Sequence, residues 1–350
     1  MEALPDDALL AVLHRLDNGD LVRCRRVCRR LRDVVGHPEL WRDRDVSGGF
    51  LLMSPPPPRC RRLALTGWRK LPLHAADAAR TTSCAAAGLS VLVDAHPLVA
   101  AGVIRRQVEL GRLTELDIAF SPACWHAGEG LLLKYALQVG GLRELHIGSS
   151  THTHTHTTGW STPVAPSLKK LAYGGDNAVL LKVLLRAHAA TLEVVRLDHL
   201  GGWDREVTDL LSSITHPWEL QCHVVRGLGP KLAECRSLTS LRLTVQDDDL
   251  LLMKDATNAI SFVRQSHITR LYVRGRNKLP MFLVRMSGDD GTPISKSKLT
   301  HVEVDMRDSP LIEGTHYELQ RGLFMVLGSF LPALEVCIFN GELCPLILRD

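Results

Sequence analysis

A short apolar pattern recurs along most of this chain of 350 residues. Its clearest copy is Leu113-Thr114-Glu115-Leu116-Asp117-Ile118, in which the first, fourth and sixth residues are apolar. Other copies start at Cys60, Leu142, Leu168, Leu192, Leu238, Ile268, Leu299 and Leu334, and weaker copies start at Leu89 and Trp218. Most starting residues lie roughly 24–31 residues apart, and a unit of that length cannot bury its apolar face alone. The pattern therefore predicts units that stack on one another.

Helical stretches separate several of these copies. Predicted helices cover residues 131–139, 179–187, 207–214, 231–235, 250–263 and 317–331. The glycine pair 140–141 is a typical helix stop, and Asp176 or Asn177 is placed to cap the second of these helices. A strand followed by a helix, repeated along the chain, predicts the α/β class.

This repeated unit resembles the leucine-rich repeat. The resemblance covers residues 60–350 and implies a solenoid, a horseshoe of parallel strands with helices on the outside. The family usually places Asn or Cys in the turn after each strand, where this chain has Ser121, Ser150 and Asp176. We therefore expect irregular repeats.

The first 45 residues follow a different pattern, that of two short amphipathic helices followed by Trp41. Pro5 suits the first turn of a helix, residues 17–19 end that helix, and Asp20 is placed to cap the next one. The apolar face of the first helix comprises Leu9, Leu10, Leu13 and Leu16, and that of the second comprises Leu21, Cys24, Val27, Cys28, Leu31, Val34 and Val35. This segment is too small to bury much core by itself, so it needs the rest of the chain or a partner.

The order of these residues resembles the F-box, the motif by which substrate receptors bind the Skp adaptor of cullin-RING ubiquitin ligases. The matching residues, which by resemblance would pack within the motif and against the adaptor, are Leu4, Pro5, Leu9, Leu10, Leu13, Leu16, Leu21, Val27, Cys28 and Trp41. Arg25, Arg26 and Leu31 depart from the family pattern.

The two resemblances together imply the substrate-recognition subunit of a Skp–cullin–F-box ubiquitin ligase. Its partners would be the Skp adaptor, through it the cullin-RING ligase, and a target protein held by the repeats. The chain itself would not be an enzyme, because the chemistry belongs to other subunits. The alternative is a non-catalytic leucine-rich-repeat scaffold with a degenerate F-box, and the departures at Arg25, Arg26 and Leu31 leave it open.

Three domains are expected from these patterns: an F-box at 1–46, a Gly/Pro-rich linker at 47–59 and the repeat domain at 60–350. The run Pro55-Pro56-Pro57-Pro58 is typical of a semi-rigid spacer. A ligand for an SH3-type groove is the alternative for this run.

The composition bounds the partners and the compartment. The net charge of +4 is small for this length, which argues against a nucleic-acid binder. The 9 cysteines form no CxxC pair, and the N-terminus has no signal-peptide pattern. No apolar run reaches the ~20 residues of a membrane span. We expect an intracellular, reduced protein in the cytoplasm, the nucleus or both, and the arginine-rich residues 23–32 are a docking helix or a nuclear-import signal.

Catalytic and metal-binding motifs are absent from the sequence. It has no GxSxG, no HExxH and no Gly-rich phosphate loop, so neither catalysis nor a cofactor is expected. The tract 151–158 alternates Thr and His and is typical of a solvated loop, with transition-metal binding as the alternative. Cys24 and Cys28 are expected to pack in the core rather than to bind metal.

A target-binding surface is expected on the strands, where residues between the buried apolar positions point outward. Arginine and tyrosine gather at these positions in the middle and later copies, and both are common at binding hot spots. An arginine cluster can also bind a phosphate or an acidic peptide. The candidate substrate-binding residues are Arg196, Arg242, Arg270, Tyr272, Arg274 and Glu303.

Overall fold

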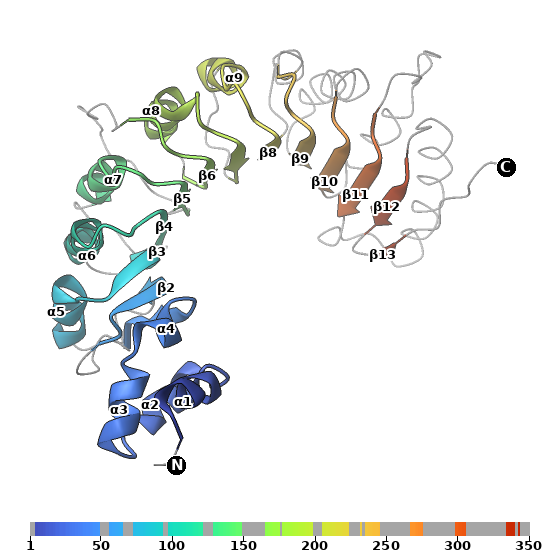
Figure 1. Ribbon diagram of the computed structural model, residues 1–350. Helices are drawn as coiled ribbons and strands as arrows, with labels where there is room; N and C mark the ends of the chain where they lie inside the picture. Colours follow the sequence, from blue (N-terminus) through green and yellow to red (C-terminus); the bar gives the residue numbers. More distant parts are fainter. Residues whose placement is uncertain are drawn as a thin grey trace, which may run out of the picture. The chain divides into compact units, whose positions relative to one another are not determined.

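The computed structural model describes residues 4–49, 56–65, 73–93, 97–121, 129–148, 165–175, 177–198, 205–223, 232, 235–245, 267–275, 298–305, 334–339 and 342–343. The chain divides into two compact units, Met1–Ser167 (unit 1) and Leu168–Asp350 (unit 2). Figure 1 shows the elements of both units.

Unit 1 begins with four short helices. They are α1 (Asp6–Leu13), α2 (Asn18–Cys24), α3 (Arg29–Val35) and α4 (Pro38–Trp41). The cap of α2 is Asp17, whose carboxylate accepts a hydrogen bond from the N–H of Asp20 at 2.8 Å. The prediction that Asp20 caps this helix is therefore wrong.

The prediction of one continuous second helix is also wrong, because the helix is interrupted between α2 and α3. Cys28 is extended (φ −154°, ψ 166°), and its sulfur accepts a hydrogen bond from the N–H of Leu31 at 3.4 Å. Apolar residues keep helical spacing on both sides of this break, so their periodicity alone does not reveal it.

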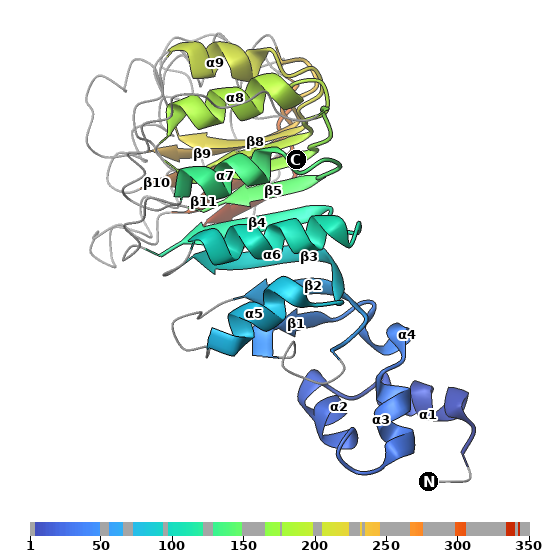
Figure 2. The ribbon, with the colours of Figure 1, turned by 90° about the vertical axis from the view of Figure 1, so that its left-hand side faces the viewer.

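In the rest of the described part of unit 1, parallel strands pair in chain order. The strands are β1 (Asp45–Ser47), β2 (Arg59–Leu65), β3 (Ala85–Val93), β4 (Glu115–Phe120) and β5 (Glu144–Ile147). The helices of this part are α5 (Leu73–Thr81), α6 (Pro97–Glu109) and α7 (Glu129–Leu137). Figure 2 shows these three helices on one face of the strands. The sequence patterns predict α7 and miss α5 and α6.

Unit 2 repeats this arrangement. Its parallel strands are β6 (Lys170–Tyr173), β7 (Val194–Leu197), β8 (Glu219–His223), β9 (Ser240–Val245), β10 (Arg270–Gly275), β11 (His301–Asp305) and β12 (Val336–Phe339). The short strand β13 (Glu342–Leu343) is antiparallel to β12. Among its described residues are the helices α8 (Ala178–His188) and α9 (Arg205–Ser212). Both units are consistent with an α/β solenoid.

The described helices of unit 2 match the predicted ones closely. Asn177, one of the two expected caps, accepts a hydrogen bond from the N–H of Leu180 at 3.0 Å, so this prediction is confirmed. The predicted helices 250–263 and 317–331 lie outside the described residues, as do Ser150, Asp176 and all of 231–235 except Leu232 and Cys235.

The strand register explains the core. In unit 1 the row Leu63, Leu89, Leu116 and Leu145 lies across four neighbouring strands, and each of these side chains is at most 2% exposed. Each strand therefore adds its apolar residues to the same buried row.

The register also corrects the two weak copies of the pattern. Leu89 is not a first position, because it lies opposite Leu63 and Leu116, which are fourth positions. Leu220 lies opposite Leu241 in the same way, so that copy starts at Pro217 and not at Trp218, which is 43% exposed. The starting residues are the small Ala86 and the proline Pro217, neither of which shows as a strong apolar position in the sequence.

The helical segment and the sheet are linked by Arg44. Its guanidinium donates to the carbonyl oxygens of Leu40 at 2.6 Å, Leu16 at 2.7 Å and His14 at 2.8 Å. The next residue, Asp45, starts β1, which pairs with β2. The sheet thus begins at the expected end of the F-box, and the linker expected at 47–59 contains the end of β1 and the start of β2.

Threonines at the second position of several copies bond to the preceding copy. The hydroxyl of Thr269 donates to the carbonyl oxygen of Thr239 at 3.3 Å, and that of Thr300 donates to the carbonyl oxygen of Thr269 at 3.2 Å. The carbonyl oxygen of Thr239 also accepts from the backbone N–H groups of Thr269 at 2.9 Å and Arg270 at 3.0 Å. Three donors therefore meet at one carbonyl between neighbouring copies.

Candidate functional site

The F-box residues named from the sequence fall into two groups in unit 1. Those in the interior of the helical segment, each at most 4% exposed, are Leu9, Leu13, Leu21 and Trp41. Those on its surface are Leu4, Pro5, Val27 and Cys28, while Leu10 and Leu16 are half-buried. Only the surface residues, and the exposed parts of the Leu10 and Leu16 side chains, can contact a partner while the helical segment stays folded.

Trp41 packs in the interior of the helical segment. Its side chain is 1% exposed, and its indole N–H donates to the carbonyl oxygen of Val35 at 2.6 Å. A buried indole needs such an acceptor. The bond ties α4 to the end of α3.

Exposed apolar side chains remain on the same segment. Leu4 is 43% exposed, Val12 55% and Val27 65%. Val12 is absent from the residues named from the sequence, because it falls off the apolar face formed by Leu9 and Leu13. Exposure of these three residues leaves apolar area for a partner to cover.

The start of the chain is held against α3 by Arg30. Its guanidinium pairs with the carboxylate of Asp6 at 2.7 Å and donates to the carbonyl oxygen of Leu4. The exposed Leu4 is thereby placed at a defined position beside α3.

Two of the three departures from the family pattern lie inside the helical segment. Arg25 is 8% exposed and Leu31 is 6% exposed. Burial, together with the charge of Arg32, lowers the pKa of Arg25. Arg26 alone is on the surface, so two of the substitutions act on packing rather than on the exposed face.

Cys28 is exposed, so the expectation that it packs in the core is wrong; Cys24 is half-buried. The cause is the break before α3, which turns Cys28 into a helix cap. Cys60 and Cys84 are buried with their sulfur atoms 3.6 Å apart, and all described cysteines are free thiols.

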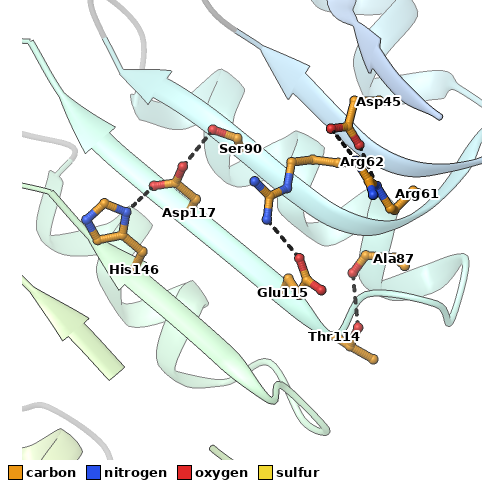
Figure 3. A network of polar contacts seen from close by, with 9 residues as sticks. All are labelled: Asp45, Arg61, Arg62, Ala87, Ser90, Thr114, Glu115, Asp117 and His146. Carbon is orange, nitrogen blue, oxygen red and sulfur yellow. Dashed lines mark hydrogen bonds and ion pairs between the residues drawn. The ribbon is translucent and has the colours of Figure 1, made fainter. Parts of the chain in front are cut away.

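The strand face of unit 1 carries a network of polar contacts, shown in Figure 3. Arg61 forms two hydrogen bonds with the carboxylate of Asp45, at 2.9 and 2.8 Å. Arg62 reaches across β3 to Glu115 at 2.9 Å. The first pair joins the neighbouring strands β1 and β2, and the second joins β2 to β4 across the strand between them.

Asp117 is the centre of the second part of this network. Ser90 donates to one carboxylate oxygen of Asp117 at 2.8 Å, and His146 contacts the other at 2.8 Å. Burial alone would raise the pKa of Asp117, but the hydrogen bonds from His146 and Ser90 outweigh it, so the pKa lies below its usual range. The carboxylate therefore stays ionised in the folded protein.

This depressed pKa predicts a pH dependence of stability. Above the unfolded pKa of about 3.9 the ionised Asp117 stabilises the fold, and this contribution is lost as the pH falls through the lower folded pKa. Asp117→Asn should reduce the free energy of unfolding by about 1 kcal/mol at pH 6, and the difference from wild type should shrink towards pH 3. Urea unfolding at the two pH values measures it. Asp77→Asn, an exposed carboxylate on α5, is the control; a gap that is equal at both pH values would contradict the prediction.

The candidate substrate-binding residues lie on neighbouring strands of unit 2. The register places Arg196 (β7), Arg242 (β9), Tyr272 (β10) and Glu303 (β11) in one row across the strands, with Gln221 of β8 between the two arginines. Arg270 and Arg274 lie on β10, two residues before and two residues after Tyr272, and both side chains are exposed. The structure thus brings all six of the named residues onto one strand face.

Glu219 organises this row. Its side chain is only 9% exposed, and it accepts from the Nε and Nη2 of Arg196 at 3.1 and 2.9 Å. The Nε of Arg242 lies 3.8 Å from the same carboxylate oxygen. One buried carboxylate therefore positions two arginines.

Tyr272 extends the row to β11. The guanidinium carbon of Arg242 lies 5.2 Å from the centre of the Tyr272 ring, within the range of a cation–π contact. The Tyr272 hydroxyl donates to Asp305 at 3.0 Å, and burial together with this bond raises the pKa of Tyr272. The series of contacts Arg196–Glu219–Arg242–Tyr272–Asp305 shares three residues with the register row and adds the two carboxylates that contact them. It is called the arginine row below.

The sequence patterns miss Glu219 and Gln221 on this face. The copy assigned to Trp218 is out of register by one residue. With this register, neither side chain falls on the exposed strand face. The alternation of Leu220 and Cys222, both buried, is the signal that gives the correct register.

Other expectations concern metals and membranes. Within the described ranges, no group of three or more His, Cys, Asp or Glu side chains is arranged to hold a metal ion. The Thr/His tract 151–158 lies outside the described residues. In the part of the chain that the structure describes, no helix has the length and apolarity needed to cross a membrane.

The comparisons with known proteins bear on the first of these sites. The family model described as F-box-like matches residues 1–47. No curated protein matches the chain. The N-terminal segment is therefore an F-box-like domain, a class of domain that generally binds Skp-type adaptors.

Proposed function

We propose that this protein is the substrate-recognition subunit of a Skp–cullin–F-box ubiquitin ligase. The observation that carries the proposal is the F-box-like match over residues 1–47. The matched helical segment has a buried apolar interior and also exposes apolar side chains. Leu4, Val12 and Val27 are the apolar residues available to the adaptor. The arginine-rich surface of α3 would suit an acidic partner.

The remainder of the chain would hold the target protein. The repeated strands and helices are proposed to be leucine-rich repeats of irregular form, and their strand face is proposed to be the target-binding surface. The ubiquitin-transfer chemistry would belong to other subunits, with this chain acting by bringing the target close to them.

The experiment that tests the proposal is co-purification with the Skp adaptor and cullin. Leu4→Ala/Pro5→Ala removes exposed groups that the helical segment does not need for its interior, so it should fold like wild type. We expect wild type to form a stoichiometric complex and the double variant to bind the adaptor about tenfold or more weakly.

The matched control is Leu98→Ala/Val108→Ala on α6, which also removes two exposed apolar side chains, 63% and 40% exposed. This control should bind the adaptor like wild type. If wild type is folded and monodisperse but does not bind the adaptor, the scaffold with a degenerate F-box replaces the proposal. Arg26, the exposed departure from the family pattern, is the residue that favours this second function.

A further inference from the structure

We infer that the arginine row of unit 2, with Arg270 and Arg274 beside it, binds an acidic peptide segment of the target protein. The inference rests on the proposed function and names the class of target for the same surface. It depends on how charge is distributed over the strands β7 to β11.

The charges of this surface are separated by depth. The carboxylates of the row are buried, since the Glu219 side chain is 9% exposed and Asp305 is 5% exposed. The guanidiniums project outward, with the side chain of Arg196 47% exposed and that of Arg242 45% exposed. A chain lying across the strands therefore meets the cations first.

The buried carboxylate of Glu219 also holds two guanidiniums in place before a ligand arrives. A guanidinium has five N–H donors. Glu219 engages the Nε and one Nη group of Arg196 and faces the Nε of Arg242. Among the described residues, no hydrogen bond uses the other N–H groups of these two arginines, so they are available to carboxylates. Pre-orientation of this kind reduces the entropy lost on binding.

The spacing of the cations favours a peptide over a single anion. From β7 to β10 there are three strand intervals, about 14 Å at ~4.8 Å each. Arg196 and Arg242 converge on Glu219, but Arg270 and Arg274 project from β10. The four cations together match several carboxylates along an extended segment better than they match one phosphate group. Two further carboxylates lie beside these cations: Asp198, exposed directly after the end of β7, accepts a hydrogen bond from Gln221 at 2.7 Å, and Glu303 is half-buried on β11.

The test uses the full chain and fluorescence anisotropy with three labelled peptides: alternating Glu and Ala, alternating Gln and Ala, and the Gln peptide with one phosphoserine. We expect the Glu peptide to bind more tightly than the other two and to weaken as salt is added. Arg242→Gln/Arg270→Gln should reduce its affinity about tenfold or more, because each lost contact is a charge-assisted hydrogen bond. Both side chains are exposed, so folding should be retained, and circular dichroism checks this.

The matched control is Arg186→Gln on α8, an exposed arginine paired with Glu206 outside the strand face, and it should bind the Glu peptide like wild type. Equal affinity for the Glu and Gln peptides, or a Glu affinity unchanged in the double variant, would overturn the inference. Tighter binding of the single phosphoserine would overturn it as well. Adaptor co-purification measured in parallel separates the two proposals: a retained adaptor complex without acidic-peptide binding refutes only this inference.

Discussion

Trp41→Ala is expected to lower the free energy of unfolding of the helical segment by about 3–5 kcal/mol. The side chain is 1% exposed, so truncation leaves a cavity between α3, α4 and the rest of the segment. It also removes the N–H that Val35 accepts at 2.6 Å, which leaves a buried carbonyl without this donor. Because a core of fewer than about 70 residues rarely supplies more than about 3–5 kcal/mol, most of the segment should unfold.

Hydrogen–deuterium exchange of the full chain measures this effect locally. Peptides from α1 to α4 should lose protection in Trp41→Ala, and peptides from β9 to β11 should keep theirs. Trp41→Phe retains most of the buried area and loses only the hydrogen bond, so a smaller cost of about 1–3 kcal/mol is expected. If Trp41→Ala and Trp41→Phe destabilise the segment equally, the loss of buried area does not cause the effect.

Gln107→Leu is the second substitution with a large expected effect. The Gln107 side chain is 0% exposed in α6 and bonds the backbone of the neighbouring strand. Its Oε1 accepts from the N–H of Ala86 at 2.9 Å, and its Nε2 donates to the carbonyl oxygen of Cys84 at 2.9 Å. Leucine has similar size but leaves both backbone groups buried and unsatisfied, at about 1–3 kcal/mol each.

We therefore expect Gln107→Leu to reduce the free energy of unfolding by about 2–5 kcal/mol. Urea unfolding followed by circular dichroism measures the loss, and exchange of the Ala86 amide locates it. Val108→Ala, the neighbouring residue at 40% exposure, is the control and should change stability by less than about 1 kcal/mol. A normal Ala86 exchange rate in Gln107→Leu would show that another group replaces the side chain.

The regular part of the fold is predictable from the sequence because its signal is local. The alternation of Leu116 and Ile118 with polar residues identifies β4, and Asn177 marks the start of α8. Helices α5 and α6 are missed because their sequences are rich in alanine and arginine and lack a leucine face. Break points such as Cys28 are missed because apolar spacing continues across them.

The candidate sites are predictable in their residues but not in their arrangement. Position within the pattern places Arg196, Arg242 and Tyr272 on one strand face, which the register bears out. Burial of Glu219 beneath two arginines depends on a strand whose register the sequence obscures. The division of the F-box residues into Trp41 inside and Leu4 outside depends on how four helices pack, which periodicity does not specify.

The threonine contacts between copies have a consequence for how such a chain changes over evolution. Each of these side-chain contacts needs only a backbone carbonyl from one copy and a threonine from the next, and Thr269 supplies both, donating to Thr239 and accepting from Thr300. Since any copy has the carbonyl, a duplicated or deleted copy with threonine at this position re-forms the same junction. At these contacts, a change in the number of copies needs no new side-chain partner in the neighbouring copy, and the width of the strand face changes with the number of copies.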